Sequence, residues 1–258
     1  MFQLGTVTYN IAKDWDLPTI LKKLESLKYE GVELRTTHKH GVEVSLNANE
    51  RREVRKRFED SPVALAGLGS AFEYHSADPA EVKKNVEETK KYVRLAHDVG
   101  SPGVKVRPNG VPKGADPDAT FRQIGLALRD VGEDALGFGV EIRVEVHGSV
   151  TSLVPNIAKI MAHADHPNVF VCWNSNPSDV VDGSVKDNFR LVAPRIREVH
   201  LRDLFDETYP WRELFALLQA ADYQGFTLAE IPESPDPDRV LRYFRSLWLA
   251  YQPRPKDV

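Results

Sequence analysis

Short apolar runs alternate along the chain with segments whose apolar residues recur at helical spacing. The runs are rich in branched residues and have the length of buried β-strands. In the segments between them, such as 16–31 (DLPTILKKLESLKYEG), apolar residues three and four apart form one stripe, as in a helix packed on a sheet. The predicted strands are 3–9, 31–35, 63–70, 103–107, 140–147, 169–174, 196–202 and 226–231. The predicted helices are 16–31, 48–60, 78–100, 116–139, 151–164, 184–193, 210–221 and 236–249.

Eight strand–helix repeats in 258 residues indicate a (β/α)8 TIM barrel. A doubly wound sheet is the rival fold, but no Gly-x-Gly-x-x-Gly sequence follows the first predicted strand. No Gly/Ser-rich linker divides the chain, so we predict a single domain over 1–258. Within it, we expect 251–258 to be a loose C-terminal tail or a contact with a partner subunit.

Composition excludes several classes of protein. Apolar residues make up 41% of the chain, and no apolar stretch is long enough to span a membrane. The net charge of -4, with basic and acidic residues alternating along helices, gives no sign of nucleic-acid binding. Cys172 is the only cysteine, which excludes an internal disulfide, and the start MFQLGTVTYN lacks the pattern of a secretion signal. We therefore expect a cytoplasmic protein.

Polar residues recur at the ends of the predicted strands, where the active site of a TIM barrel lies. Strand side chains alternate between two sides, so residues two apart face the same side. Four such pairs occur, and two further strands carry a single polar residue near their ends. The pairs are Glu33 and Arg35, Lys105 and Arg107, Glu145 and His147, and His200 and Arg202, and the single residues are Asn174 and Glu230.

Three of these residues have the chemistry of a metal site. Glu145, His200 and Glu230 supply two hard oxygens and one imidazole from three strands. That donor set suits one divalent ion, namely Mn²⁺, Mg²⁺, Co²⁺ or Zn²⁺. A bound cation would also compensate the carboxylate of Glu145, whose burial in a core strand is otherwise costly. The alternative is a structural ion pair of the glutamates with Arg143, Arg202 or Lys105.

The order of several short sequences resembles a known family. GVEL at 31–34, EVH at 145–147, REVHLRD at 197–203 and TLAEIPES at 227–234 are similar to segments of the xylose isomerase-like TIM barrels. These include the sugar phosphate isomerases and epimerases, and their fold is shared with type IV endonucleases of DNA repair. The resemblance covers nearly the whole chain.

The resemblance implies a metal bound by a Glu, an Asp, a His and a Glu from strands five to eight. Matched residue by residue, these positions are Glu145, Asn174, His200 and Glu230. In the ketose epimerases of this group the two glutamates are also the acid/base pair, which implies Glu145 and Glu230 as catalytic residues. Asn174 stands where an Asp is usual, and Pro177 where many members have a His. The Asn at this position leaves three outcomes open. Metal binding could be weaker, the site could prefer Mn²⁺, or three ligands could hold the metal while Asn174 contacts substrate.

Other polar residues are candidates for binding substrate. His147 is expected to contact it, as is Glu33, while His38 lies in a loop (RTTHKHG, 35–41) that could close over the site together with His40. Lys105, Arg107 and Arg202 would hold an anionic or hydroxyl-rich molecule. Their alternative role is to neutralise Glu33, Glu145 and Asp203.

Proton abstraction next to a carbonyl is the chemistry that these groups share. We therefore predict a metal-dependent isomerase or epimerase that acts on a small sugar or sugar derivative. A metal-dependent lyase or dehydratase acting on a keto-sugar or keto-glycoside is the first alternative, and a non-catalytic sugar-binding partner subunit the second. Phosphodiester hydrolysis is disfavoured, because it would call for more His and Asp ligands and a basic surface. The sequence leaves open whether the chain forms a homo-oligomer.

Overall fold

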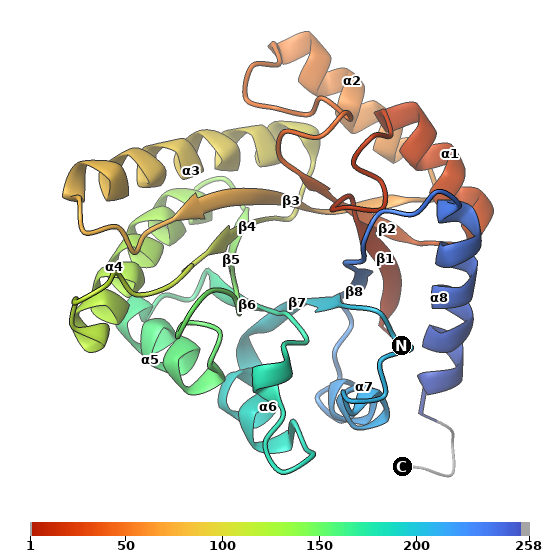
Figure 1. The fold of residues 1–258 in the computed structure, drawn as a ribbon. Coiled ribbons are helices and arrows are strands. Elements are labelled where there is room, and N and C mark those ends of the chain that lie inside the picture. Colours follow the sequence, from red (N-terminus) through yellow and green to blue (C-terminus); the bar gives the residue numbers. More distant parts are fainter. Residues whose placement is uncertain (1, 254–258) are drawn as a thin grey trace.

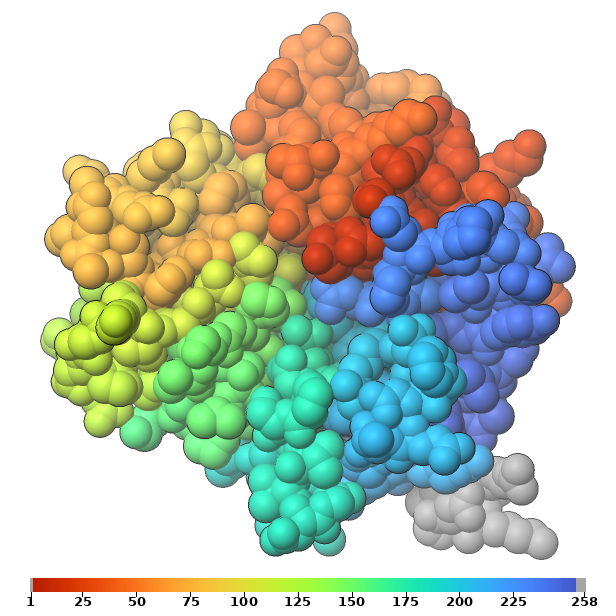
Figure 2. Space-filling model, in the orientation of Figure 1, coloured from red at the N-terminus to blue at the C-terminus, as the bar shows by residue number. Residues whose placement is uncertain are grey.

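The barrel is closed and parallel throughout. A computed structural model of the protein describes residues 2–253, and within this range strands β1 to β8 pair in sequence order, with β8 returning to pair with β1. The helices surround the strands, as Figure 1 shows. In Figure 2, successive segments occupy successive sectors around the molecule, and the last of these lies beside the first. The predicted (β/α)8 TIM barrel is confirmed.

The strands agree with the predicted runs, with differences at their ends. β3 extends three residues beyond its predicted end, to Glu73, whereas β5 stops before His147 and β6 before Asn174. Several polar residues predicted at strand ends therefore lie in the first residues of the following loops. The strands are β1 (Gln3–Val7), β2 (Gly31–Arg35), β3 (Ala64–Glu73), β4 (Gly103–Arg107), β5 (Glu141–Glu145), β6 (Val169–Trp173), β7 (Ile196–Leu201) and β8 (Phe226–Ala229).

The helices pack their apolar stripes on the outside of the barrel. Asn47 begins α2 with a capping box, because its side chain accepts from the backbone of Glu50 and the Glu50 side chain accepts from the backbone of Asn47. The helices are α1 (Leu17–Leu27), α2 (Ala48–Glu59), α3 (Pro79–Val99), α4 (Pro117–Leu136), α5 (Val154–Ala164), α6 (Lys186–Val192), α7 (Trp211–Ala220) and α8 (Pro237–Tyr251), with short 3₁₀ turns at Pro177–Asp179 and Ala193–Arg195.

The first residue of the expected tail belongs to the last helix. Tyr251 is the last residue of α8, and its hydroxyl donates to the Leu204 carbonyl at 3.2 Å, so its place in a loose tail is wrong. The remainder of that prediction, from 254 to 258, lies outside the described residues. In the part of the chain that is described, no helix is both long and apolar enough to cross a bilayer.

The interior of the barrel carries charge, unlike the apolar layer between strands and helices. Glutamates, basic side chains and a histidine from β2, β4, β5 and β7 are buried there, and glycines on β3 give them room. A Cβ atom on Gly69 would lie 2.3 Å from Glu33 Oε1, and one on Gly67 would lie 3.1 Å from Glu198 Oε1. Side chains larger than hydrogen at these positions would displace the carboxylates. The buried charged residues and histidine of the interior are Glu33, Lys105, Arg143, Glu145, Glu198 and His200.

Candidate active site

His200 lies at the centre of the candidate site. It is fully buried on β7, and its Nδ1 faces Glu230 Oε2 at 3.5 Å and Glu145 Oε1 at 4.0 Å. Nδ1 makes no hydrogen bond to any of the residues that the structure describes. A buried polar atom without a hydrogen bond is costly, and a cation bound between this nitrogen and the two carboxylates would remove that cost.

The opposite nitrogen of the same ring faces a carboxylate. His200 Nε2 lies 3.3 Å from Glu33 Oε2, and both side chains have no exposed surface. Burial alone would raise the pKa of Glu33, but His200 and Lys105 outweigh it and lower that pKa to about 2. Glu33 is thus an anion that orients the imidazole and leaves Nδ1 free, as carboxylates behind metal-binding histidines do. The substrate contact expected of Glu33 stays a prediction, whereas the contact observed is with His200.

Glu145 has donors on both of its oxygens. Lys105 Nζ lies 2.5 Å from Glu145 Oε2, and Asn174 Nδ2 donates to Glu145 Oε1 at 3.0 Å. Burial would raise the pKa of Glu145, but Lys105 and His200 hold it below its usual range. The ion pair that the sequence left open for Glu145 is therefore formed with Lys105, and Glu145 is ionised.

These residues fit a divalent cation. Glu145, His200 and Glu230 each offer an atom within 4.8 Å of the other two, and the unpaired Nδ1 of His200 is one of the three. Carboxylate oxygens and an imidazole nitrogen suit Mn²⁺, Co²⁺ or Zn²⁺. The amide nitrogen of Asn174 donates to the Glu145 carboxylate, and the role of Asn174 as a fourth ligand remains a prediction.

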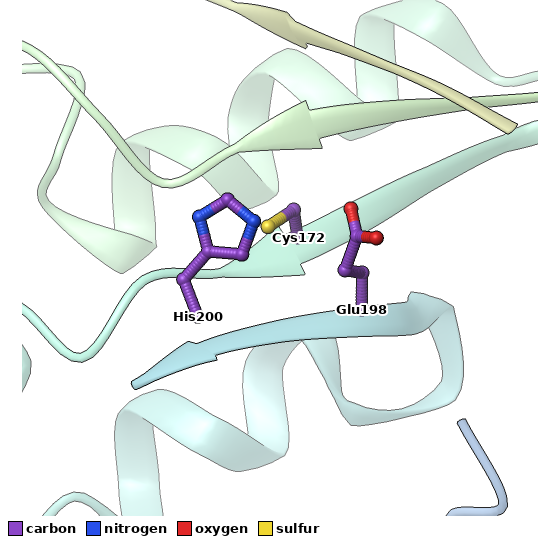
Figure 3. Close-up of side chains that lie close together, drawn as sticks. All are labelled: Cys172, Glu198 and His200. Carbon is purple, nitrogen blue, oxygen red and sulfur yellow. The ribbon is translucent and has the colours of Figure 1, made fainter. Parts of the chain in front are cut away.

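A second polar group lies deeper in the barrel. Figure 3 shows Glu198 and His200 from β7 and Cys172 from β6 pointing to one region, and their ligand atoms lie within 4.8 Å of one another. Because His200 belongs to both groups, they form one continuous polar column. The sequence predicts neither Cys172 nor Glu198 as part of the site, although Glu198 is two residues before His200 and shares its side of the strand.

The base of this column holds a proton. Burial, followed by the nearby Glu33 carboxylate, raises the pKa of Glu198 to about 8. Glu198 is thus protonated at neutral pH and can donate to Glu33, which accounts for oxygens of both residues that otherwise have no donor. Arg143 Nη1 donates to the other oxygen of Glu198 at 3.0 Å.

At the mouth of the barrel, four polar side chains form a chain of hydrogen bonds. Arg107 Nη2 and Asn109 Nδ2 both donate to Glu73 Oε1, at 2.5 and 2.6 Å. Asn109 Oδ1 in turn lies 2.7 Å from His147 Nδ1. Arg107 and His147 were predicted at the mouth, but Glu73 and Asn109 were missed. The longer β3 carries Glu73 to this position, and Asn109 lies in a loop, where no periodicity predicts a direction.

The remaining predicted residues lie around the rim. Arg202 pairs with Asp206 at 3.0 Å instead of the expected Asp203. The two aspartates lie in the same loop, and a turn between them brings Asp206 back to Arg202. His38 Nδ1 lies 2.9 Å from Thr8 Oγ1, and burial together with Arg35 lowers the pKa of His38 to about 4. His40 is buried and its Nε2 contacts the Arg35 carbonyl at 2.8 Å, so it holds the loop and does not face the site.

The fold and the position of these groups define a TIM barrel with a polar site at the carboxyl ends of its strands. The description "xylose isomerase-like TIM barrel" fits residues 21–247, and the chain belongs to that family. Sequence comparison with curated proteins finds no match.

Solved structures with the same fold include enzymes that act on sugars. The 3-keto-D-glucoside 4-epimerase YcjR from E. coli superposes with a TM-score of 0.79 at 14% identity, over 97% of this chain and 99% of that one. D-Psicose 3-epimerase from Clostridium cellulolyticum H10, solved with D-tagatose, gives 0.81 at 14% identity, over 98% and 100%. The IOLI protein, solved with a zinc atom, gives 0.81 at 14% identity, over 97% and 98%. At this identity the likeness establishes the fold.

Proposed function

We propose that the protein is a divalent-metal-dependent isomerase or epimerase of a sugar or sugar derivative. The observation that carries the proposal is the buried, unpaired Nδ1 of His200, held by Glu33 and aimed at the carboxylates of Glu145 and Glu230. The names of structurally similar proteins, which include sugar epimerases and a zinc-bound protein, support the same class.

Glu145, His200 and Glu230 would hold the cation. Asn174 would contribute its amide oxygen or contact the substrate. A divalent ion at this place would polarise a substrate carbonyl and favour the negative charge that develops on its oxygen. Lys105 adds a fixed positive charge beside Glu145, and Asn174 in place of the family's usual carboxylate leaves out a negative one, so both favour the negative charge that develops on the substrate oxygen.

Glu230 is the better placed of the two glutamates to move a proton. Both oxygens of Glu145 have donors, and that side chain is 2% exposed, whereas the Glu230 side chain is 22% exposed at the mouth. In the proposed reaction, Glu230 takes the proton from a carbon next to the substrate carbonyl. Return of a proton to the opposite face of the same carbon gives an epimer, and return to the neighbouring carbon gives the isomer.

The pairing of the charges at the mouth favours a sugar without a large anionic group. Arg107 donates to Glu73, and Arg202 is paired with Asp206, so both guanidinium groups already have carboxylate partners. His147 and Asn109 add groups that hydrogen bond to hydroxyls. We therefore propose an unphosphorylated keto-sugar or keto-glycoside as the substrate.

Solvent deuterium tests this function directly. The full chain is incubated in D₂O with Mn²⁺ and, in turn, D-fructose, D-tagatose, D-psicose, L-ribulose or a 3-keto-D-glucoside, and carbon-bound deuterium is followed by NMR. Wild type should incorporate deuterium into at least one sugar, and Glu230→Gln should reduce the rate by at least about 100-fold, in line with the usual contribution of a general base.

Glu233→Gln is the matched control, because that exposed side chain lies three residues further along the same loop and is paired with Lys13. It should behave as wild type. The absence of metal binding together with the absence of exchange in every sugar would contradict the proposal and favour a non-catalytic binding protein.

A further inference from the structure

The hydrogen bonds at the mouth determine which nitrogen of His147 carries the proton. Glu73 sets the direction of these hydrogen bonds, because a carboxylate accepts hydrogen bonds and cannot donate them. Asn109 must therefore turn its amide nitrogen toward Glu73 Oε1, at 2.6 Å, and its amide oxygen toward His147 Nδ1, at 2.7 Å. An amide oxygen also only accepts, so the hydrogen between Asn109 and His147 belongs to Nδ1. In the neutral ring, Nε2 is then left with its lone pair.

The backbone holds the two loops together at this point. Gly148 has a φ of +92°, and a Cβ atom there would lie 2.6 Å from the Asn109 Cα. Asn109 itself has a φ of +56°, a left-handed conformation that Asn and Asp adopt more readily than most residues. Close contact between the loop after β4 and the loop after β5 therefore depends on both residues and fixes the position of the imidazole.

The free nitrogen of His147 is available to a ligand. His147 is half-buried and lies two residues after Glu145. Nε2 makes no hydrogen bond to any residue between 2 and 253, and it is not among the buried polar atoms that lack a partner. It thus keeps access to the mouth.

We propose that Asn109 is a positioning residue that holds His147 in the tautomer with an unprotonated Nε2, and that this nitrogen accepts a hydrogen bond from a hydroxyl group of the ligand. The identity of the ligand as a sugar rests on the proposed function, but the tautomer does not. An acceptor at this place selects a hydroxyl over a carbonyl or phosphate oxygen, because two acceptors do not hydrogen bond. His147 is thereby a determinant of specificity for one hydroxyl position of the substrate.

The tautomer can be measured without substrate. The full chain, labelled with ¹⁵N-histidine, is studied at pH 8 by long-range ¹H–¹⁵N correlation, and the His147 signals are assigned by their loss in His147→Gln. Wild type should show the proton on Nδ1. Asn109→Gly, which keeps the left-handed backbone but removes the acceptor, should shift His147 toward the tautomer with the proton on Nε2, which free histidine favours in water.

Two further variants separate positioning from general disruption. The double variant Glu73→Gln/Asn109→Asp tolerates the same backbone, offers an oxygen to Nδ1 and can hydrogen bond through the new amide nitrogen at position 73, so it should keep the wild-type tautomer. Glu73→Gln can present either its amide oxygen or its amide nitrogen to Asn109, so it no longer fixes the direction of the Asn109 amide and should give a mixture of tautomers. A wild-type His147 with its proton on Nε2, or an unchanged tautomer in Asn109→Gly, would overturn the inference. Because no substrate is present, either result is independent of the deuterium experiment on the sugars.

Discussion

Lys105 Nζ lies 2.5 Å from Glu145 Oε2 in the interior of the barrel, and the two side chains are 5% and 2% exposed. Glu145, Glu33 and Glu230 raise the pKa of Lys105 against the effect of burial, so the lysine is charged. The ammonium group of Lys105 and the proposed cation would therefore both contact the Glu145 carboxylate. Lys105 stabilises the metal-free chain and at the same time lowers the gain from binding a metal.

Replacing Lys105 by Met should make the protein depend on its metal. Removal of one partner from a buried ion pair leaves an uncompensated charge and typically costs about 3–5 kcal/mol. We expect the metal-free Lys105→Met variant to melt well below wild type, and Mn²⁺ to raise its melting temperature by more than it raises that of wild type. Thermal unfolding with and without Mn²⁺ measures both effects.

Lys90→Met is the control for this experiment, because Lys90 pairs with Asp130 at 2.9 Å on the surface, where such pairs contribute about 1 kcal/mol or less. An equal Mn²⁺ shift in wild type and Lys105→Met would show that the lysine does not influence the cation.

His200→Ala should abolish stoichiometric metal binding. The variant loses the one nitrogen of the proposed ligand set, whereas wild type should bind a full equivalent of Mn²⁺ or Zn²⁺. Elemental analysis of dialysed protein gives the metal content. His97→Ala, on the exposed face of α3, should bind as wild type. A full equivalent at the same place in His200→Ala would remove His200 from the site.

Asn174→Asp should tighten metal binding and weaken the metal-free fold. The new carboxylate would lie about 3 Å from Glu145 Oε1, where the amide of Asn174 now donates. A further negative charge about 4 Å from a cation is worth several kcal/mol at an effective dielectric near 20, before desolvation is subtracted. Even a remainder of about 1.4 kcal/mol is tenfold in affinity. Metal titration at one pH and ionic strength tests this, and unchanged or weaker binding would place Asn174 outside the coordination sphere.

Asp179→Asn should change how stability depends on pH. Burial raises the pKa of Asp179 from 3.8 to about 7, despite hydrogen bonds from the Asn176 backbone and the Tyr209 hydroxyl. Since the folded pKa is the higher one, the folded state binds the proton more tightly, and this stabilisation is lost as pH rises from about 4 to above 7. The neutral amide does not undergo this loss. Between pH 5 and pH 8, the free energy of unfolding of the variant should therefore rise relative to that of wild type by on the order of 2 kcal/mol.

Urea unfolding at the two pH values measures this gain. Asp187→Asn, at a side chain that is 95% exposed, should show no such change. A difference between Asp179→Asn and wild type that is the same at pH 5 and pH 8 would mean that Asp179 does not titrate in this range.

The sequence predicts the barrel and the polar residues near the strand ends because strand periodicity gives the side that each residue faces and places each strand end to within about three residues. Glu145 and His200 converge as this rule requires. The sequence does not predict which basic residue pairs with Glu145. Strand periodicity places Lys105, Arg143 and Arg202 on the same side, but it does not give their side-chain conformations. Nor does it find Asn109, whose direction depends on a loop conformation with positive φ.

The only cysteine of the chain is a practical advantage. Cys172 is fully buried, and burial raises the pKa of its thiol to about 12, so almost no reactive thiolate is present at neutral pH. A cysteine introduced in place of Phe205, which is 71% exposed in the loop after β7, would then be the one site open to maleimide reagents. Fluorescent or spin labels can thus be attached next to Arg202 without first removing a native thiol, and movement of this loop can be followed while metals and sugars are added.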